Sequence, residues 1–262
     1  MRIRNSEFDL GKMTYVMGIL NVTPDSFSDG GLHNTVNSAL AHAGKMIEEG
    51  ADIIDIGGES TRPGFEKVSE EEELERVIPV IESLRKISDV PISIDTTKPG
   101  VAAAAISAGA DIINTVEGVD APKEMLEAVK DSGAWFVMTY EKSYVNQFGE
   151  AMAKMAEGAV SAGISRDKII VDPGVGFGKT TEENLRIVNE LPLITQIPYP
   201  VLLGCSRKSM IGNVLNAPTD DRLSGTIVTT VLAGLAGVGI VRVHDVKENV
   251  QALKMLKSIC EV

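Results

Sequence analysis

Met17-Gly18-Ile19-Leu20-Asn21-Val22-Thr23-Pro24-Asp25-Ser26-Phe27-Ser28-Asp29-Gly30-Gly31 is the stretch that most directly indicates how this chain folds. It opens with a short apolar run that ends abruptly at Asn21, which is the pattern of a buried strand. The polar loop that follows holds two carboxylates, three hydroxyls and Phe27, and it ends in two glycines. An apolar strand that opens into such a loop is how an α/β barrel presents a ligand site.

The rest of the chain repeats this pattern of a short apolar run followed by a longer amphipathic segment. The clearest helical segment is Ser69–Ile87, where Ser69 and Glu72 predict a capping box, and Asp245 with Glu248 predicts a similar start for the last helix. Glu49–Asp55 also reappears almost unchanged as Ala108–Asn114, each copy being a helix end, a glycine cap and a strand. The predicted strands are Val16–Asn21, Asp52–Gly57, Pro91–Asp95, Asp111–Asn114, Trp135–Thr139, Ile169–Asp172, Val201–Cys205 and Ile240–His244.

Alternating strands and helices with buried strands predict a parallel sheet. Eight such units, nearly every one closed by a polar residue, favour an α/β protein of the (β/α)8 TIM-barrel class, a single domain covering residues 1–262. A doubly wound open sheet is the alternative. It would normally carry a glycine-rich dinucleotide loop after its first strand, and the sequence has none there.

Charge and composition exclude several classes of function. The 262-residue chain has a formal net charge of −12, which argues against binding to nucleic acid and to membrane surfaces. No secretory signal is evident, and Cys205 and Cys260 lack metal-ligand spacing, so we expect a reduced, cytoplasmic protein. The uncharged segment Leu223–Val241 is long enough to cross a bilayer, but its threonines and glycines favour a buried barrel helix followed by a strand.

Strand-end residues of a parallel barrel all ring one mouth. Arginine, lysine and histidine are frequent among them and predict a cationic pocket suited to phosphate oxygens. The glycine-rich run Asp172–Lys179 lacks the spacing of a P-loop, but it could hold Phe177 against a planar ligand. The cationic residues are Arg62, Arg207, Lys208, Arg242 and His244.

A second group at the same mouth consists of Asp95, Asn114, Asp172 and Lys208. Carboxylates and an amide offer acceptors and donors in one plane, which suits a heterocycle with amino and ring N–H groups, such as a pterin or a guanine-like base. Lys208 could meet the ring carbonyl. These residue types therefore indicate a flat heterocycle deep in the mouth and an anion at its rim.

Six ordered motifs in this chain resemble the dihydropteroate synthase family, whose members share the pterin-binding barrel. The resemblance extends over nearly the whole length, which makes it far more specific than any single motif. The motifs are Gly18–Gly30, Asp55–Gly64, Ser93–Thr96, Asp172–Lys179, Ser206–Ser209 and Arg242–Val246.

The resemblance implies condensation of a dihydropterin-CH₂-diphosphate with p-aminobenzoate, releasing diphosphate, with Mg²⁺ as cofactor. It also implies a homodimer and small-molecule substrates as the only other partners. Asp95, Lys208, Arg242 and His244 would be the catalytic residues. By matching motif positions, the resemblance implies that the pterin would be bound by Asp95, Asn114, Met138, Asp172 and Lys208, and the diphosphate by Asn21, Arg62, Arg242 and His244, with Asn21 at the metal. The p-aminobenzoate site would be formed by Phe27, Thr61, Arg62, Pro63, Phe177 and Ser209. The loops would be ordered by Asp29 and Arg62.

Two departures from the family pattern keep other functions open. Asn114 is followed by Thr115 where the family usually has Asp, and Met138-Thr139-Tyr140 stands where the family usually has Met-His-Met. One alternative is a pterin-dependent methyltransferase acting on a corrinoid protein. It would not need the diphosphate cluster or the p-aminobenzoate loops, so Arg242, His244 and the Thr61–Pro63 loop disfavour it. The other is a non-catalytic pterin-binding subunit.

Overall fold

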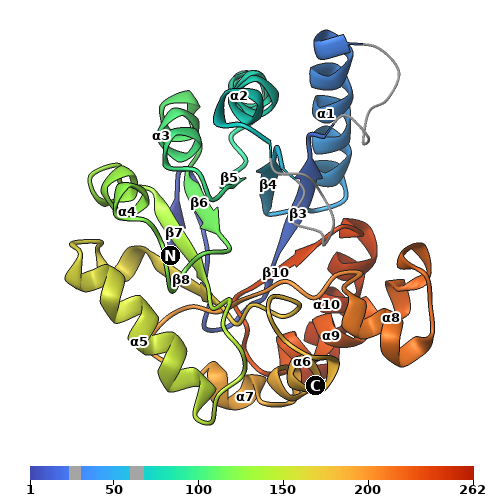
Figure 1. Cartoon of the computed structure of the whole chain (residues 1–262). Coiled ribbons are helices and arrows are strands. Elements are labelled where there is room, and N and C mark those ends of the chain that lie inside the picture. Colours follow the sequence, from blue (N-terminus) through green and yellow to red (C-terminus); the bar gives the residue numbers. More distant parts are fainter. Residues whose placement is uncertain (24–30, 60–67) are drawn as a thin grey trace.

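Eight parallel strands form a barrel in the order β8-β7-β6-β5-β4-β3-β10-β9 (Figure 1). An isolated parallel bridge between Val171, in β8, and Val201, just before β9, joins the two edges of the sheet. The computed structural model describes residues 1–23, 31–59 and 68–262, with the backbone alone for 31–34. The predicted (β/α)8 barrel is therefore confirmed, and the open-sheet alternative is wrong.

The predicted strands all form, with small shifts at their ends. The last but one is the shortest, because only Leu202 and Leu203 pair where Val201–Cys205 was predicted. A short N-terminal hairpin that the sequence did not predict pairs Arg2 with Glu7. The strands are β1 (Arg2–Ile3), β2 (Ser6–Glu7), β3 (Tyr15–Asn21), β4 (Ile53–Gly57), β5 (Ile92–Asp95), β6 (Ile112–Thr115), β7 (Trp135–Thr139), β8 (Ile169–Asp172), β9 (Leu202–Leu203) and β10 (Ile240–Val243).

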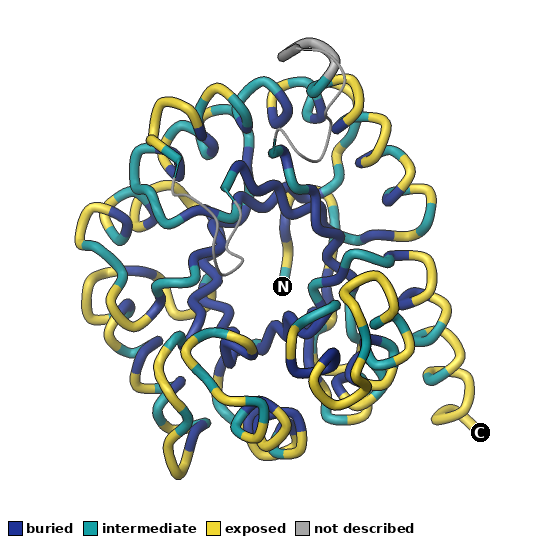
Figure 2. Tube along the Cα trace, turned by 45° about the vertical axis from the view of Figure 1, so that its right-hand side comes forward, coloured by how far each residue is buried: buried dark blue, intermediate teal, exposed yellow. Residues whose placement is uncertain are grey.

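Helices surround the strands, so that the strands are buried and the outer helix faces are exposed (Figure 2). Gly50 and Gly109, in the two copies of the repeat, have φ of 101° and 110°, as expected for glycine caps. The helices are α1 (Gly31–Glu48), α2 (Glu70–Ile87), α3 (Pro99–Ala108), α4 (Lys123–Lys130), α5 (Phe148–Ser161), α6 (Thr181–Asn189), α7 (Leu191–Ile194), α8 (Ser209–Leu215), α9 (Leu223–Leu235) and α10 (Val246–Cys260), with 3-10 turns at Arg166–Lys168 and Thr219–Asp221.

Alternation along each strand divides the apolar core into two parts. Ile53 belongs to a cluster inside the barrel, whereas its neighbours Ile54 and Ile56 pack in the layer between strands and helices. Side chains of a strand point alternately to its two faces. Asp55, two residues after Ile53, therefore lies on the interior face, and this parity fixes which side chains reach the mouth.

The helix at Leu223–Leu235 forms as predicted, but its burial is the reverse of what an apolar segment suggests. Thr226, Thr229 and Thr230 are buried, while leucines and a valine on the opposite face are exposed. The predicted barrel helix is therefore buried on one face only. Within the part of the chain that the structure describes, no helix combines the length and apolar character needed to span a bilayer.

Candidate active site

Register between neighbouring strands brings the predicted strand-end residues to one mouth of the barrel. Asp95 pairs in register with Gly57 on one side and with Asn114 on the other. Asn114 follows Ile112 by two residues and Asp172 follows Ile170 by two, and both isoleucines belong to the interior cluster. The polar side chains thus form a layer directly above the apolar interior of the barrel.

Arg242 is the centre of this polar layer. Its Nε donates to Asp55 Oδ2 at 2.6 Å, and its Nη2 donates to Asp95 Oδ2 at 2.5 Å. Asn114 Nδ2 donates to the same oxygen of Asp55 at 3.3 Å. The second oxygen, Asp55 Oδ1, is fully buried without a hydrogen-bond partner among the described residues.

Asp172 and Lys208 lie together on the other side of the mouth, around Gly204. A β-carbon built on Gly204 would be 3.5 Å from Asp172 Oδ2 and 3.9 Å from Lys208 Nζ. Asp172 Oδ1 accepts a hydrogen bond from the backbone N–H of Gly174 at 2.6 Å. Glycine at this position leaves open the space that the two charged groups face.

The pKa values of these groups are shifted chiefly by removal from water. Burial raises the pKa of Asp95 to about 7, although the attraction of Arg242 opposes the shift. Burial also raises the pKa of the Asp172 carboxyl and lowers the pKa of Lys208, and each of these two groups opposes the shift of the other. Such shifts are typical of functional sites.

Phe177 and Ser209 lie beside Lys208. Lys208 Nζ is 4.4 Å from the centre of the Phe177 ring and donates a hydrogen bond to the carbonyl of Val175. Lys208 is the N-terminal cap residue of α8, and Ser209, the first residue of that helix, is exposed. The Gly-rich loop after β8 therefore brings its phenylalanine to the mouth, as the sequence predicts.

His244 is held by Ser206. Ser206 Oγ lies 3.0 Å from His244 Nδ1, and the same oxygen accepts the backbone N–H of His244 at 3.1 Å. His244 follows Arg242 by two residues, so the two side chains share one face of the strand path. The histidine is thus fixed in orientation at the rim, next to the arginine.

Arg207 does not contribute an unpaired positive charge to the predicted cationic pocket. Its Nε and Nη2 make a two-pronged contact with Asp245, at 2.9 and 2.5 Å. Asp245 is the N-cap residue of α10, so the predicted start of the last helix is confirmed. Its side chain makes no capping hydrogen bond, because the bidentate arginine contact engages both carboxylate oxygens.

Asn21 ends β3 close to Asp95. A β-carbon built on Gly57 would be 3.9 Å from Asn21 Oδ1 and 3.7 Å from Asp95 Cβ. Among the described residues no group of three or more His, Cys, Asp or Glu side chains could hold a metal ion. Mg²⁺ commonly binds through one or two protein oxygens together with water and substrate phosphates, and the amide oxygen of Asn21 fits that mode.

Some predicted residues do not join this group. Met138 is buried in the layer between strands and helices, so the structure does not bring it to the polar layer, and its role stays a prediction. Thr139, in the departure from the family pattern, follows the interior residue Val137 by two and is buried. Phe27, Asp29, Thr61, Arg62 and Pro63 lie outside the described residues.

A buried ionic cluster that the sequence did not reveal lies beside the mouth. Lys98 Nζ contacts Glu73 Oε2 at 2.5 Å and also bonds to the carboxylate of Glu59. Glu73 is one of four glutamates in the first turn of α2, and its side chain is only 1% exposed. Glu59 Oε2 also accepts the backbone N–H of Val68 at 3.3 Å.

Asp55 is the main functional candidate that sequence reasoning missed. It appears in the sequence as one polar residue inside the run Ile53–Gly57, away from the strand end. The signal that could have found it is parity, since it stands two residues after an interior isoleucine and two before Gly57. A buried carboxylate on an interior face is costly unless it has a charged partner.

Known proteins with this pattern share both sequence and structure with the chain. The family model described as "Pterin binding enzyme" matches residues 17–244. A dihydropteroate synthase from Clostridium beijerinckii is 47% identical over 262 residues, covering 97% of each chain.

Two solved structures are similar over almost their whole length. Dihydropteroate synthase from Clostridium difficile, solved with pteroic acid, has a TM-score of 0.91 and 48% identity, covering 97% of this chain and 99% of that one. The Xanthomonas albilineans enzyme, solved with 4-aminobenzoic acid, has a TM-score of 0.89 and 42% identity, covering 95% and 94%.

Proposed function

The chain belongs to the pterin-binding enzyme family and acts as a dihydropteroate synthase, and from this premise we propose how the residues at the barrel mouth divide the reaction between them. The reaction joins a dihydropterin-CH₂-diphosphate to p-aminobenzoate and releases diphosphate. The relatives are synthases over nearly the full length, so the methyltransferase and the non-catalytic subunit are set aside.

We propose that Asp95, Asn114, Asp172 and Lys208 bind the pterin ring. The observation that carries this proposal is the convergence of two carboxylates, an amide and an ammonium around one opening, although they come from the ends of β5, β6 and β8 and from the N-terminus of α8. Carboxylates accept from the amino and ring N–H groups of a pterin, and an ammonium donates to its carbonyl. Asp55 supports this set by holding both Arg242 and Asn114.

Arg242 and His244 would bind the diphosphate as it leaves. The two ion pairs of Arg242 use two of the five N–H donors of a guanidinium, so donors remain to meet an anion. As the C–O bond to diphosphate breaks, the pterin methylene would become electron-poor, and the negative charges of Asp95 and Asp172 on the bound ring would stabilise it. The aniline nitrogen is a weak nucleophile, which favours this dissociative path without a covalent enzyme intermediate.

Mg²⁺ would be held by the Asn21 amide oxygen together with oxygens of the diphosphate. When bound, the ion would neutralise part of the negative charge that develops on the leaving group. Asn21 itself would orient the substrate, because its side chain lies next to Asp95 at the end of β3.

The p-aminobenzoate site would be formed by Phe177 and Ser209 beside Lys208, completed by Phe27, Thr61, Arg62 and Pro63. The position of the Phe177 ring against Lys208 Nζ supports the first part of this assignment. The second part rests on the family motifs, as does the proposed ordering of the loops by Asp29 and Arg62 and a further contact of Arg62 with the diphosphate. Met138 would support the pterin site indirectly, because its side chain packs on the helix-facing side of β7.

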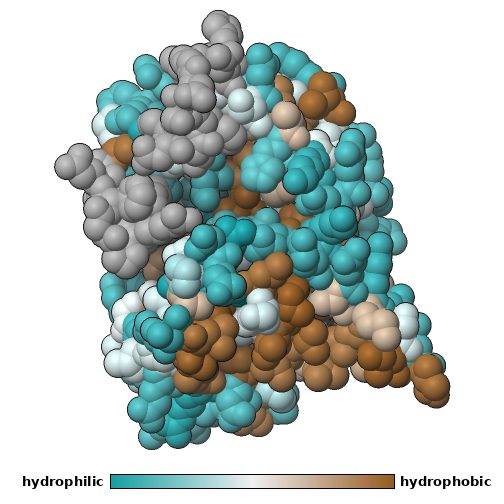
Figure 3. Space-filling view, turned by 90° about the vertical axis from the view of Figure 1, so that its right-hand side faces the viewer, coloured by the Kyte–Doolittle hydropathy of each residue, from teal (hydrophilic) through white to brown (hydrophobic). Residues whose placement is uncertain are grey.

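We also propose that the enzyme is a homodimer that joins through α9 and the neighbouring α10. Val228, Leu232 and Leu235 form an exposed stripe along α9, and Met255 and Ile259 are exposed on α10. Figure 3 shows hydrophobic side chains gathered into a broad patch on this face of the molecule. Monomers rarely expose an apolar patch of this kind without a partner.

Free Cys205 and Cys260 support a reducing, cytoplasmic location.

A turnover experiment tests the proposed reaction. The purified chain with both substrates and Mg²⁺ should release diphosphate and form dihydropteroate in equal amounts, and should release almost none when p-aminobenzoate is left out. Trapping a covalent pterin–protein adduct during turnover would overturn the proposed path.

A further inference from the structure

Lys179 ends the glycine-rich loop after β8, and its ammonium is surrounded by main-chain oxygens. Nζ donates to the carbonyl of Tyr140 at 2.7 Å and to the carbonyls of Gly174 and Phe177, both at 3.1 Å. An ammonium has three N–H donors, so all of them are used. Among residues 1–23, 31–59 and 68–262 this nitrogen has no carboxylate within 4.0 Å, so its hydrogen bonds go to main-chain oxygens alone.

Aromatic rings complete the surroundings of this ammonium. The ring centres of Tyr140 and Phe148 are 5.7 and 5.8 Å from Nζ, within the range of cation–π attraction. Burial lowers the pKa of Lys179 to about 8, against the opposing charge of Asp172. Removing an ammonium from water costs free energy, so its hydrogen bonds to the loop must compensate for the lost hydration.

The loop around Lys179 is pressed against the end of β7 without forming a strand there. Gly174 and Gly178 have φ of 67° and 59°, and a β-carbon on Gly178 would be 2.8 Å from the carbonyl oxygen of Glu141. A β-carbon on Gly174 would strike the carbonyl of Tyr140. Besides the ammonium, two hydrogen bonds join the loop to this segment: the Tyr140 N–H donates to the carbonyl of Asp172 at 2.8 Å, and Ser143 Oγ donates to the carbonyl of Gly178 at 3.4 Å. Lys179 adds three more and links the carbonyl of Tyr140 to two carbonyls of the loop itself.

The same loop carries groups that touch the active site. The carbonyl of Val175 accepts from Lys208, and the ring of Phe177 lies under the Lys208 ammonium. We propose that Lys179 is a positioning residue: its ammonium fixes the β8 loop on the end of β7 and thereby sets Lys208 and Phe177 for the two substrates. This inference rests on the proposed function, since it assigns Lys179 a role in the same site.

Replacing the lysine tests the inference through a split between kcat and KM. Lys179→Met keeps the apolar stem and removes the three donors. We expect its KM for p-aminobenzoate and its Kd for pteroic acid to rise about tenfold, the change equivalent to one lost charge-assisted hydrogen bond. A residue needed only for folding would lower the active fraction, and hence kcat, with both constants unchanged. Lys179→Arg, which keeps a positive charge, should recover part of the lost affinity.

Lys154→Met, at an exposed position on α5, is the matched control and should behave as the wild type. Equal KM and Kd values in Lys179→Met and Lys154→Met would overturn the inference. If Lys179→Met does not fold, Lys179→Gln takes its place, and wild-type constants in that variant would also overturn it. Failure of the wild type itself to form dihydropteroate would instead refute the proposed function, so the two failures are distinguishable.

Discussion

At the scale of single residues, Asp95 shows how the site balances opposing effects. Its carboxylate is buried beside a second carboxylate, Asp55, and the one guanidinium of Arg242 is shared between them. Burial and the charge of Asp55 favour the protonated form, while Arg242 favours the ionised form, and the outcome is a pKa of about 7. Asp95 therefore changes its charge near neutral pH.

The sign of this shift gives a prediction for ligand binding. The folded pKa of Asp95 lies above its ordinary value of 3.8, so ionising it as the pH rises through about 7 lowers the stability of the ligand-free protein. A bound pterin whose N–H groups donate to the ionised carboxylate offsets this loss of stability. The affinity for pteroic acid should then rise about tenfold between about pH 6 and about pH 8, as expected for one group with this pKa.

Calorimetric titration at several pH values measures this dependence, with Asp95→Asn as the control. The asparagine variant should bind more weakly and with little change over the same range. A wild-type affinity that is independent of pH would contradict the assignment of Asp95 to the pterin.

Sequence reasoning found those residues that end strands and missed those that act within them. Asp95, Asn114 and Asp172 stand at strand ends, so the barrel topology alone predicted their convergence. Asp55 stands mid-strand, and only the parity of the interior face identifies it. Arg207 was predicted to add positive charge to an anion pocket, but its guanidinium pairs with Asp245. This pairing depends on how close two loops lie in space, which the sequence does not give.

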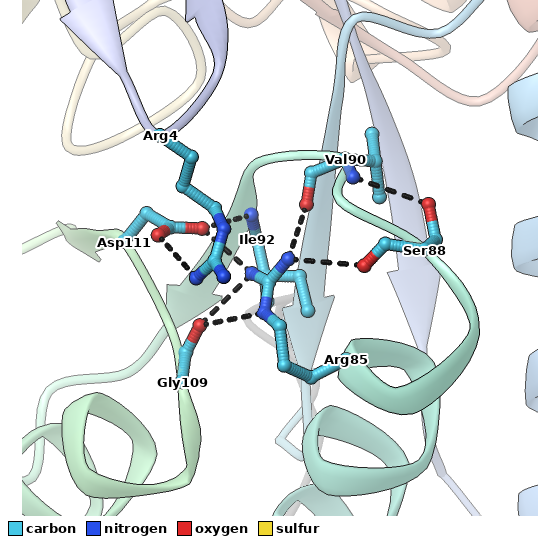
Figure 4. A network of polar contacts seen from close by, with 7 residues as sticks. All are labelled: Arg4, Arg85, Ser88, Val90, Ile92, Gly109 and Asp111. Carbon is cyan, nitrogen blue, oxygen red and sulfur yellow. Dashed lines mark hydrogen bonds and ion pairs between the residues drawn. The ribbon is translucent and has the colours of Figure 1, made fainter.

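At the scale of elements, the opposite end of the barrel is held by a network that serves stability. Arg85 of α2 donates to the carbonyls of Gly109 and Val90 and pairs with Asp111 at 2.7 Å (Figure 4). Asp111 also pairs with Arg4 of the N-terminal segment at 3.3 Å. One arginine thus joins α2 to the starts of β5 and β6, far from the strand ends that carry the active site.

Removing this arginine should therefore affect stability and leave catalysis intact. Arg85→Ala breaks several charge-assisted hydrogen bonds and should lower the free energy of unfolding by about 3 kcal/mol. Urea denaturation measures this loss, and Lys86→Ala, at the exposed neighbouring position, is the control. A changed KM for either substrate would contradict the separation between the two ends of the barrel.

The ends of helices and strands were predicted well where local sequence signals are strong, and poorly where pairing with another strand decides them. Ser69 was predicted to begin a helix, and its hydroxyl accepts the N–H of Glu72 at 3.1 Å. The glycine caps at Gly50 and Gly109 were predicted in the same way. β9 keeps only two paired residues, and the N-terminal hairpin was not foreseen, because neither has a strong periodic pattern of its own.

At the scale of the whole molecule, α9 links fold and assembly. It turns threonines and an alanine toward the barrel and leaves Val228, Leu232 and Leu235 outside. Apolarity alone could not reveal this orientation, since both faces of the segment are uncharged. The exposed stripe is what we expect of a helix that meets a second copy of the same chain.

A charge placed in this stripe should separate the subunits. Leu232→Glu adds a carboxylate to the proposed interface of an already acidic chain and should give a monomer in analytical ultracentrifugation, whereas the wild type sediments as a dimer. Ile87→Glu, at an exposed apolar position on α2, should remain dimeric. A dimeric Leu232→Glu or a monomeric wild type would contradict the proposed interface.

The central claim is that residues scattered along the chain bind one molecule, its ring held by Asp95, Asn114, Asp172 and Lys208 and its diphosphate by Arg242 and His244. Calorimetry with the dihydropterin-CH₂-diphosphate, and with the same pterin lacking the diphosphate, tests this most directly. We predict one bound molecule per chain. Asp172→Asn should bind both ligands more weakly, whereas His244→Ala should bind only the ligand that carries the diphosphate more weakly. Unchanged diphosphate affinity in His244→Ala, or two independent bound molecules per chain, would contradict it.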